Sequence, residues 1–321
     1  MTHPLEGVLV VDKPLGPTSH DVVARARRAL REKRIGHTGT LDPMASGVLP
    51  LVIGRATRLA TFLSASEKVY VAGVRLGGAT DTYDAAARLA AGEPPPPAPG
   101  VSLDQVEAAL TGFRGTFAQM PPPYSAKKVD GVPAYKLARK NEATALSAVE
   151  VTVRQLTLLG LENGLARLEV ISSAGFYVRS LAHDLGTVLG CGAHLESLRR
   201  TRAGIFDLAQ AVPLDDLDRH PESAASRLVP LADLLPDMPA VRLTARGSVR
   251  VGHGNSVSSD DFARLGTGSV WGAASSQGVD GGAARAFAGG TRVRMLDESG
   301  RLLAIAESGP DGLLRPSIVL V

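Results

Sequence analysis

The segment from residue 36 to residue 50, GHTGTLDPMASGVLP, constrains the fold more than any other part of the chain. Its glycines permit positive φ or close backbone approach, and Pro43 disfavours helical backbone at Asp42. The segment is therefore expected to be a loop that presents Asp42. An ordinary Asp-Pro turn beside glycines is the alternative interpretation. Phosphate-binding and dinucleotide-binding loops are excluded, because the segment has neither Gly-Lys-Ser/Thr nor GxGxxG.

Composition narrows the class of protein. A length of 321 residues favours about two domains, and 44% hydrophobic residues can build a sizeable core. Cys191 is the single cysteine, which excludes a disulfide framework or a cysteine metal cage within the chain and suits a reducing compartment. The first residues, MTHPLEG, show no basic and apolar leader, and no apolar run reaches membrane-helix length. We therefore expect a cytoplasmic protein with no membrane partner.

Basic residues are concentrated in the first part of the chain. Residues 7–11 predict a buried strand, and the following pattern predicts a helix capped by Ser19 or Asp21. One face of this helix is apolar, and the other carries Arg25, Arg27, Arg28, Arg31, Lys33 and Arg34, offset only by Glu32. A pI near 9.1 and such clusters suit a polyanionic partner. The basic face is either a phosphate track leading to the Asp42 loop or a solvated helix surface.

The middle of the chain alternates between helical and strand patterns. Residues 56–62 and 101–115 predict helices, and 68–77 predicts a strand that carries Tyr70. On propensity alone, Tyr70 would be a core or cross-strand packing residue. Residues 118–140 mix lysines and arginines with tyrosines, which indicates either an RNA-facing segment or an ordinary solvated loop.

Two strands and a helix are predicted between residues 150 and 186, with Tyr177 and Arg179 at the strand end. On extended backbone, residues two apart point to the same side. Beyond residue 238 short alternating strands, with a hairpin turn at 298–300, predict a small β-barrel. The Gly/Ala/Ser-rich stretch 266–290 is expected to be an insertion.

Several segments together resemble a known enzyme family. Residues 36–57 resemble the catalytic motif of the tRNA pseudouridine-55 synthases, the TruB family, while 7–23 resembles its opening motif and 173–206 its second catalytic motif. The resemblance implies an α/β (α+β) pseudouridine synthase fold, with a mixed, largely antiparallel sheet and flanking helices. It implies a catalytic domain over 1–237, with an RNA-contacting insertion at about 118–145, and a small PUA-like β-domain over 238–321.

The resemblance also assigns site residues. Asp42 would be the catalytic carboxylate, Arg179 would pair with it, and Tyr70 would stack on the target base near the departing proton. Tyr177 and Leu198 would contact the uridine. His37 is expected to act as a wedge in the RNA. The basic residues expected to contact or support RNA binding are Lys13, Arg27, Arg28, Arg31, Lys127, Lys128, Arg199 and Arg200.

The expected reaction isomerises a uridine of the tRNA T arm, position 55, to pseudouridine. It breaks the C1′–N1 bond and joins C1′ to C5, so we expect no cofactor and no metal. An ionised carboxylate can attack C6 or C1′ or stabilise charge on the ribose, and an adjacent arginine favours the ionised form. The expected partner is tRNA, bound by a monomer. Two other functions stay open: a tRNA-folding chaperone or RNA-binding module with idle catalytic residues, and a glycosidase-like hydrolase, for which Asp42 lacks an evident acidic partner.

Overall fold

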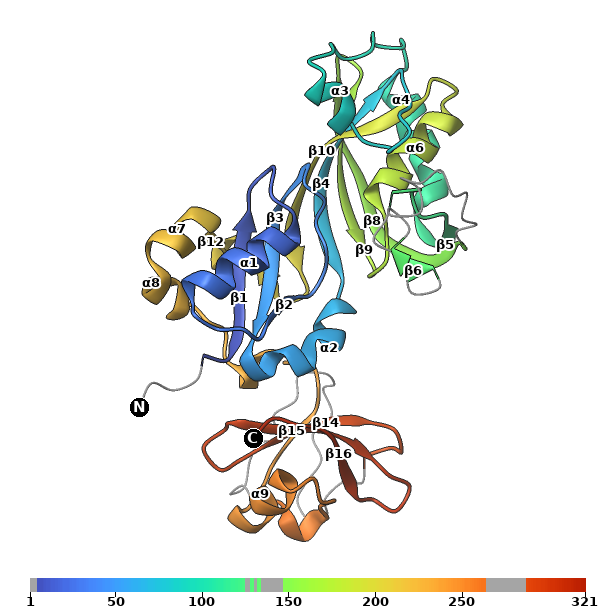
Figure 1. The fold of residues 1–321 in the computed structure, drawn as a ribbon. Coiled ribbons are helices and arrows are strands. Elements are labelled where there is room, and N and C mark those ends of the chain that lie inside the picture. The colour runs from blue at the N-terminus through green and yellow to red at the C-terminus, as the bar shows by residue number, and fades with distance from the viewer. Residues whose placement is uncertain (1–4, 125–127, 130–131, 134–146, 264–286) are drawn as a thin grey trace. The chain divides into compact units, whose positions relative to one another are not determined.

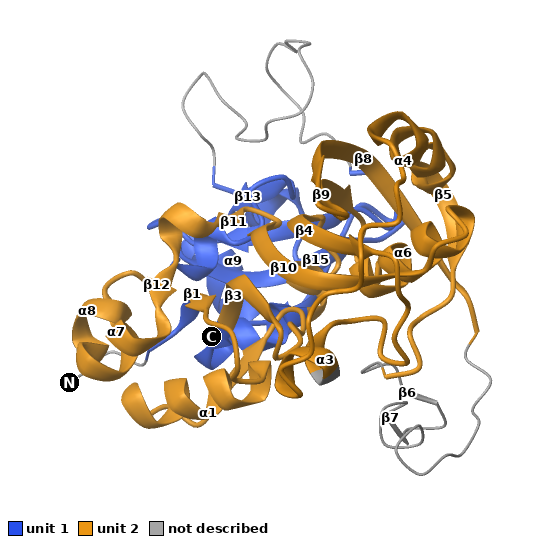
Figure 2. Ribbon diagram, turned by 90° about the horizontal axis from the view of Figure 1, so that it is seen from above, with its two compact units in different colours: residues 1–8, 52–60, 228–321 blue, residues 9–51, 61–227 orange. Residues whose placement is uncertain are grey.

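The computed structural model describes the chain except residues 1–4, 125–127, 130–131, 134–146 and 264–286. The chain forms two compact units: unit 1 comprises residues 1–8, 52–60 and 228–321, and unit 2 comprises residues 9–51 and 61–227 (Figure 2). Residues 52–60, which the predicted division at residue 237 assigns to the catalytic domain, belong to unit 1. No helix in the described ranges is long and apolar enough to cross a membrane.

A large mixed sheet organises unit 2 (Figure 1). Its strand order is β12 (Val212–Pro213), β1 (Gly7–Lys13), β3 (Ala45–Ile53), β10 (Ala193–Ala203), β4 (Lys68–Leu76), β9 (Leu165–Ser172), β8 (Val149–Glu162) and β5 (Gly115–Gln119). Two short strands lie off this path: β2 (Ile35–His37) pairs with β3, and β11 (Phe206–Asp207) pairs with β10. The run from β10 to β5 is antiparallel, whereas β12–β1 and β3–β10 are parallel pairs. The expected mixed, largely antiparallel sheet is confirmed.

Helices flank this sheet. They are α1 (Ser19–Ala29), α2 (Ala60–Ser64), α3 (Ala86–Ala90), α4 (Leu103–Leu110), α6 (Val178–Val188), α7 (Leu214–Arg219) and α8 (Pro221–Ala225). Short 3-10 helices span Gly54–Leu59, Thr111–Phe113 and Leu208–Gln210. Helical periodicity located the longer elements, because their apolar positions form the faces that pack on the sheet.

The α1 helix differs from its prediction at two positions. Its N-cap is Thr18, whose Oγ1 accepts from the Asp21 N–H at 3.1 Å while Asp21 accepts from the Thr18 N–H at 2.9 Å. Arg25 does not belong to a free basic face, since it donates to Asp215 at 2.9 Å and to Asp218 at 2.7 Å on α7. Arg27 and Arg28 stay exposed.

Unit 1 contains a four-stranded sheet in the order β13 (Ala240–Arg242), β14 (Arg292–Leu296), β15 (Leu302–Ser308) and β16 (Leu314–Val319). The predicted hairpin is confirmed by the pairing of Leu296 with Leu302. Helix α9 (Ala245–Gly252) contributes Val251 to a core with Val293 and Met295. The described strands form an open sheet rather than the predicted barrel, because alternation reveals strands but not closure. Most of the predicted insertion, 266–286, lies outside the described residues.

Helix α6 and strand β10 approach closely at Gly186. A Cβ at this position would lie 2.1 Å from the backbone N of Ala193 and 2.4 Å from the carbonyl carbon of Gly192. Although alanine gains about 1 kcal/mol over glycine in helix propensity, Gly186→Ala should lower the free energy of unfolding by about 1–3 kcal/mol through overpacking. Urea unfolding would measure the loss. Gly112→Ala is the control, since no atom lies within 4 Å of its Cβ; equal stability of the two variants would contradict the close packing.

Candidate active site

A short loop between β2 and β3 carries Asp42. Backbone contacts fix both of its sides: Gly16 N–H donates to Pro43 O at 2.8 Å, and Ala45 N–H donates to Asp42 O at 3.0 Å. The buried Ser19 hydroxyl adds two hydrogen bonds to the backbone of Leu41, at 2.8 and 3.0 Å. The loop is shorter than predicted, because the second half of 36–50 is strand β3. Asp42 is thereby presented from a fixed backbone.

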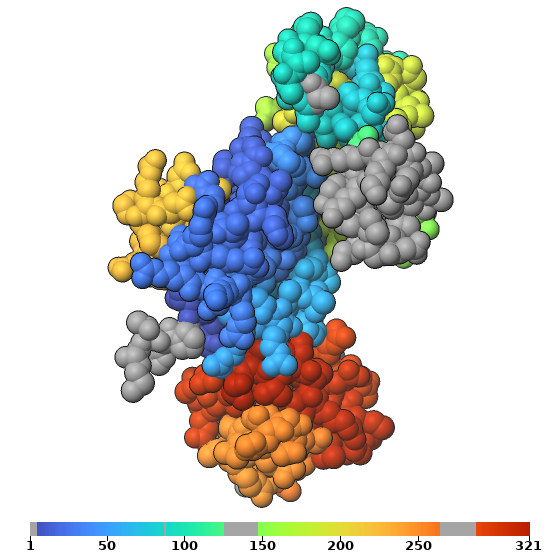
Figure 3. Space-filling model, viewed as in Figure 1, coloured from blue at the N-terminus to red at the C-terminus, as the bar shows by residue number. Residues whose placement is uncertain are grey.

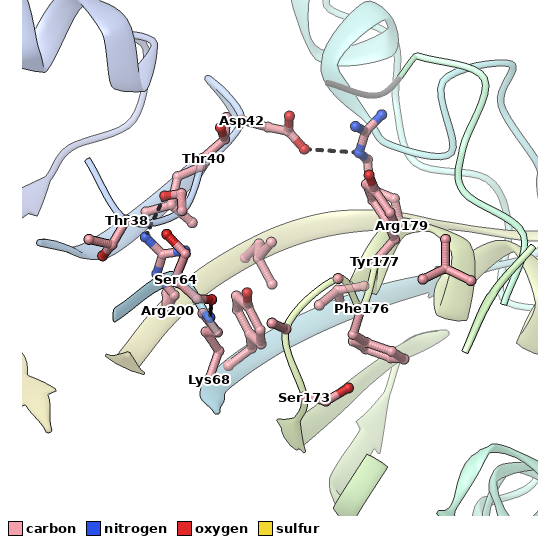
Figure 4. Close-up of a pocket in the computed structure, with 18 residues that line it drawn as sticks. Thr38, Thr40, Asp42, Ser64, Lys68, Ser173, Phe176, Tyr177, Arg179 and Arg200 are labelled. Atoms are coloured by element: carbon pink, nitrogen blue, oxygen red, sulfur yellow. Dashed lines mark hydrogen bonds and ion pairs between the residues drawn. The ribbon is translucent and has the colours of Figure 1, made fainter. Parts of the chain in front are cut away.

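Arg179 lies at the start of α6 and reaches Asp42. Its Nε is 2.9 Å from Asp42 Oδ2, and its side chain is only 6% exposed (Figure 4). The other guanidinium nitrogens donate to the carbonyls of Thr82 at 3.0 Å and Tyr124 at 2.8 Å, and Nη1 lies 3.6 Å from Asp84 Oδ2. A planar guanidinium can satisfy several fixed acceptors at once. Arg179 therefore joins the Asp42 loop to two other segments of the chain, at residues 82–84 and at Tyr124.

An open cavity of about 480 Å³ lies beside this ion pair. Asp42, Tyr70, Tyr177, Arg179 and Leu198 all line it. Strand order explains their meeting: β10 lies between β3 and β4, and it pairs Leu198 with Ala45 on one side and with Ala72 on the other. The volume is typical of a small-molecule or nucleoside site.

Tyr177 and Arg179 line the cavity from the start of a helix and not from the predicted strand end. Strand β9 ends at Ser172, and Tyr177 is the extended N-cap of α6 rather than a strand residue. The Gln119 side chain fixes this cap, since it accepts from the Tyr177 N–H at 2.8 Å and donates to the Tyr177 carbonyl at 3.0 Å. Gln119 has no sequence signal that would have identified it.

Lys13 and Arg200 support the loop from within the protein. Lys13 is fully buried, and its Nζ donates to Ala45 O at 2.6 Å and Pro14 O at 3.0 Å. Arg200 is 1% exposed and donates to Val48 O at 2.7 Å and to Gly39 O at 3.0 Å. The position of Lys13 agrees with the supporting role expected of it. The RNA contact expected of Arg200 is corrected, because its guanidinium is buried and donates to backbone carbonyls.

Burial shifts the pKa of two lysines at this site. It lowers the pKa of Lys13 to about 8; the nearby Asp42 carboxylate opposes this shift and Arg200 adds to it. It also lowers the pKa of Lys68 to about 8, again with a contribution from Arg200. Lys68 lines the cavity and donates to the carbonyls of Ser64 and Ser66. The sequence analysis did not single out Lys68, because a lysine at a strand start ordinarily lies at the surface.

The other predicted residues lie around the cavity. His37 is half-buried on β2 and is not among the lining residues; burial, then Arg200 and His20, lower its pKa. Arg199 is half-exposed and pairs with Asp12 at 2.8 and 3.2 Å. Lys127 lies outside the described residues, and Lys128 is described only by its backbone in β6 (Lys128–Val129), which pairs with β7 (Val132–Pro133).

Asp84 is the acidic residue whose position the sequence did not reveal. The Asp84 carboxylate accepts from the Thr82 hydroxyl at 2.9 Å and the Ala86 N–H at 3.0 Å, and it faces Arg179. Among the described residues, no group of three or more His, Cys, Asp or Glu side chains could hold a metal ion.

Comparison with known proteins identifies the family. The model of the TruB family pseudouridylate synthase N-terminal domain matches residues 27–178, and that of the tRNA pseudouridylate synthase B C-terminal domain matches residues 179–237. A tRNA pseudouridine synthase B of Solibacter usitatus is 44% identical over 324 residues, covering 98% of this chain and 100% of the relative. The chain belongs to the TruB family.

Further similarities agree with TruB family membership. The tRNA pseudouridine synthase B of Symbiobacterium thermophilum is 46% identical over 253 residues, which cover 78% of this chain and 82% of the relative. The crystal structure of a Cbf5-Nop10-Gar1 complex contains a chain with a TM-score of 0.72 and 26% identity, over 99% of this chain and 85% of that one. As a member of the TruB family, the chain is an isomerase, a pseudouridylate synthase.

The buried Lys13 generates a prediction about pH. Its pKa is about 8 in the folded chain and 10.5 ordinarily. Between these values the unfolded chain holds a proton that the folded chain has released, so the free energy of unfolding rises with pH. Relative to Lys13→Met, the wild type should gain on the order of 1 kcal/mol from about pH 7 to about pH 10. Urea unfolding of both proteins measures the difference; a difference that does not change with pH would contradict the shift.

Proposed function

We propose that this TruB-family enzyme converts the uridine at position 55 in the T arm of tRNA to pseudouridine, with Asp42 as its catalytic carboxylate. The observation that carries the proposal is the 2.9 Å contact between Arg179 and Asp42 at the cavity. The relatives named tRNA pseudouridine synthase B support tRNA as the substrate. The T arm rests on the likeness of residues 36–57 to the family's catalytic motif.

The chemistry requires a carboxylate in its ionised form. The N1–C1′ bond breaks, the C5–C1′ bond forms, one proton leaves C5 and one is gained at N1, so the reaction is balanced without oxidation. Asp42 can attack the nucleoside or stabilise positive charge that develops on the ribose. Arg179 Nε lies 2.9 Å from Oδ2 of Asp42, and the Asp42 side chain is 38% exposed and lines the cavity. The carboxylate is therefore accessible to a substrate while it is paired with the arginine.

The walls of the cavity suit a base removed from its stack. Flipping costs a few kcal/mol, and stacking on an aromatic ring returns about 1–3 kcal/mol per base. Tyr70 provides a ring, and Leu198 and Tyr177 provide further contacts to the uracil. Tyr70 would also stand near C5, from which the proton must leave. His37 would enter the vacated stack; its lowered pKa favours the neutral ring, which stacks without desolvating a charge.

The surface of α1 suits the phosphates of the bound RNA. Arg27, Arg28 and Arg31 are exposed, and the chain continues from them through β2 into the Asp42 loop. This region lies within the blue, N-terminal part of the surface in Figure 3. Arginine side chains along such a track would hold the backbone without reading sequence. Arg199 and the 118–145 segment would add contacts, and the PUA-like C-terminal domain would grip the RNA.

Neither alternative function has an observation in its favour. A glycosidase-like hydrolase needs a second acid that faces the substrate. Asp84 shares Arg179 with Asp42, but it is 6% exposed and is not among the cavity-lining residues, so it does not face the substrate. A chaperone with idle residues would not require a carboxylate held at a cavity by a buried arginine.

Asp42→Asn separates chemistry from recognition. The variant keeps the size of the side chain but loses its charge and nucleophilicity, while phosphate contacts and stacking should preserve tRNA binding. Tritium release from C5-labelled uridine in tRNA should fall at least about 1,000-fold. Substantial release by Asp42→Asn would falsify the assignment and move the search for a nucleophile to Asp81 or Asp84. Wild-type refolding of tRNA without release would favour the chaperone.

The matched control variant replaces Arg27, Arg28 and Arg31 with alanine. It should show the reverse result, with weaker tRNA binding and preserved turnover at saturating tRNA. The slope of log affinity against log salt should shrink by roughly one for each lost phosphate contact. Unchanged binding and slope would return α1 to the solvated-surface interpretation.

A further inference from the structure

The turn at residues 80–84 has an unusual backbone. Tyr83 adopts φ of +62°, a left-handed conformation that is rare for a bulky side chain. Such residues persist only where surrounding contacts over-determine them, and they occur preferentially at functional sites. The backbone of Tyr83 is fixed by two hydrogen bonds: its N–H donates to Thr80 O at 3.1 Å, and its carbonyl accepts from Leu195 N–H at 2.9 Å.

Both neighbours of Tyr83 contact Arg179. The Thr82 carbonyl accepts from Nη1 at 3.0 Å, and the Asp84 carboxylate lies 3.6 Å from the same nitrogen. The left-handed residue between them directs one backbone acceptor and one side-chain acceptor toward a single guanidinium. The conformation of the turn thus determines where Arg179 can be held.

The Tyr83 ring makes a second contact with α6. It stacks on the His183 ring with a centroid distance of 3.8 Å and an interplanar angle of 11°. His183 follows Arg179 by four residues, so the two side chains lie on the same face of the helix. The same turn and the same helix face are therefore joined twice, once through the guanidinium and once through the rings.

Hydrogen bonding at Nδ1 does not explain the position of His183. Its Nδ1 is buried without a hydrogen-bond partner in the described part of the chain. Buried polar atoms are ordinarily paired, so an unpaired one calls for an explanation. A flat ring that matches Tyr83 provides one, because offset stacking needs the face of the imidazole and not its nitrogens.

We propose that Tyr83 and His183 are positioning residues, whose stack holds the 80–84 turn on α6 so that Arg179 stays directed at Asp42. The inference rests on the proposed role of the Asp42–Arg179 pair. Neither residue lines the cavity, so the stack acts on the reaction through Arg179 and should affect the rate of conversion rather than tRNA affinity.

The test compares His183→Ala with His183→Phe. The alanine variant should lower the single-turnover rate of tritium release roughly ten- to hundredfold, because small displacements of a catalytic group are costly, while the tRNA dissociation constant stays within about twofold. Phenylalanine keeps a flat ring and should restore the rate to within about threefold of the wild type. A His183→Ala enzyme that is folded and fully active, or a His183→Phe enzyme as slow as His183→Ala, would overturn the proposal.

An Arg179→Lys background distinguishes positioning from general loosening of the fold. Lysine cannot bridge the Thr82 carbonyl and Asp42 as the guanidinium does. Adding His183→Ala to the Arg179→Lys enzyme should therefore lower its single-turnover rate less than about threefold. If His183→Ala lowers the rate as much in the Arg179→Lys enzyme as in the wild type, the stack does not act through Arg179. Should His183→Ala not fold, Tyr83→Gly removes the same stack and accommodates positive φ, with the same expected results. If the His183 variants contradict the positioning role while Asp42→Asn is inactive, the proposed function stays intact. If Asp42→Asn is active, both the proposed function and the positioning role lose their basis.

Discussion

The guanidinium of Arg179 is the interaction on which the site depends. It is 6% exposed and contacts a carboxylate, two carbonyls and a second carboxylate, contributed by three segments far apart in the sequence. A buried cation is tolerated only when its charge and donors are satisfied, so these partners fix one another. Figure 4 shows Asp42 and Arg179 meeting from separate elements. The orientation of the Asp42 carboxylate thus reflects the packing of α6 as much as its own loop.

The sheet supplies the frame for this interaction. Placing β10 between β3 and β4 brings the Asp42 loop, Leu198 and Tyr70 to one cavity. The approach of β3 to β10 requires a glycine at residue 47, which has φ of +105° and whose Cβ would lie 2.1 Å from Arg200 O. The Arg200 side chain packs against the Asp42 loop and donates to the carbonyls of Gly39 and Val48. One strand order therefore explains how the strands pair, how the Asp42 loop is supported and which residues form the cavity walls.

Sequence reasoning predicted what local patterns encode. Periodicity located several strands and helices, including β1, β4 and α1, but not the central strands β3 and β10. The motif likeness brought together Asp42 and Arg179, which the structure places 2.9 Å apart. It missed what depends on tertiary packing. The sequence did not reveal that the Lys13 side chain is fully buried. The contact of Tyr83 with His183 joins residues from distant segments and has no local signature. Alternation also could not distinguish an open C-terminal sheet from a barrel.

Arg179→Lys in single-turnover tritium release tests the central claim most directly. Lysine keeps the positive charge but not the planar set of donors that reaches Asp42, Thr82 and Tyr124 together. If the fixed geometry of the guanidinium positions Asp42, the rate should fall at least about 100-fold while tRNA affinity stays within about threefold. If charge alone sufficed, Arg179→Lys would convert tRNA at nearly the wild-type rate, and that result would contradict the account.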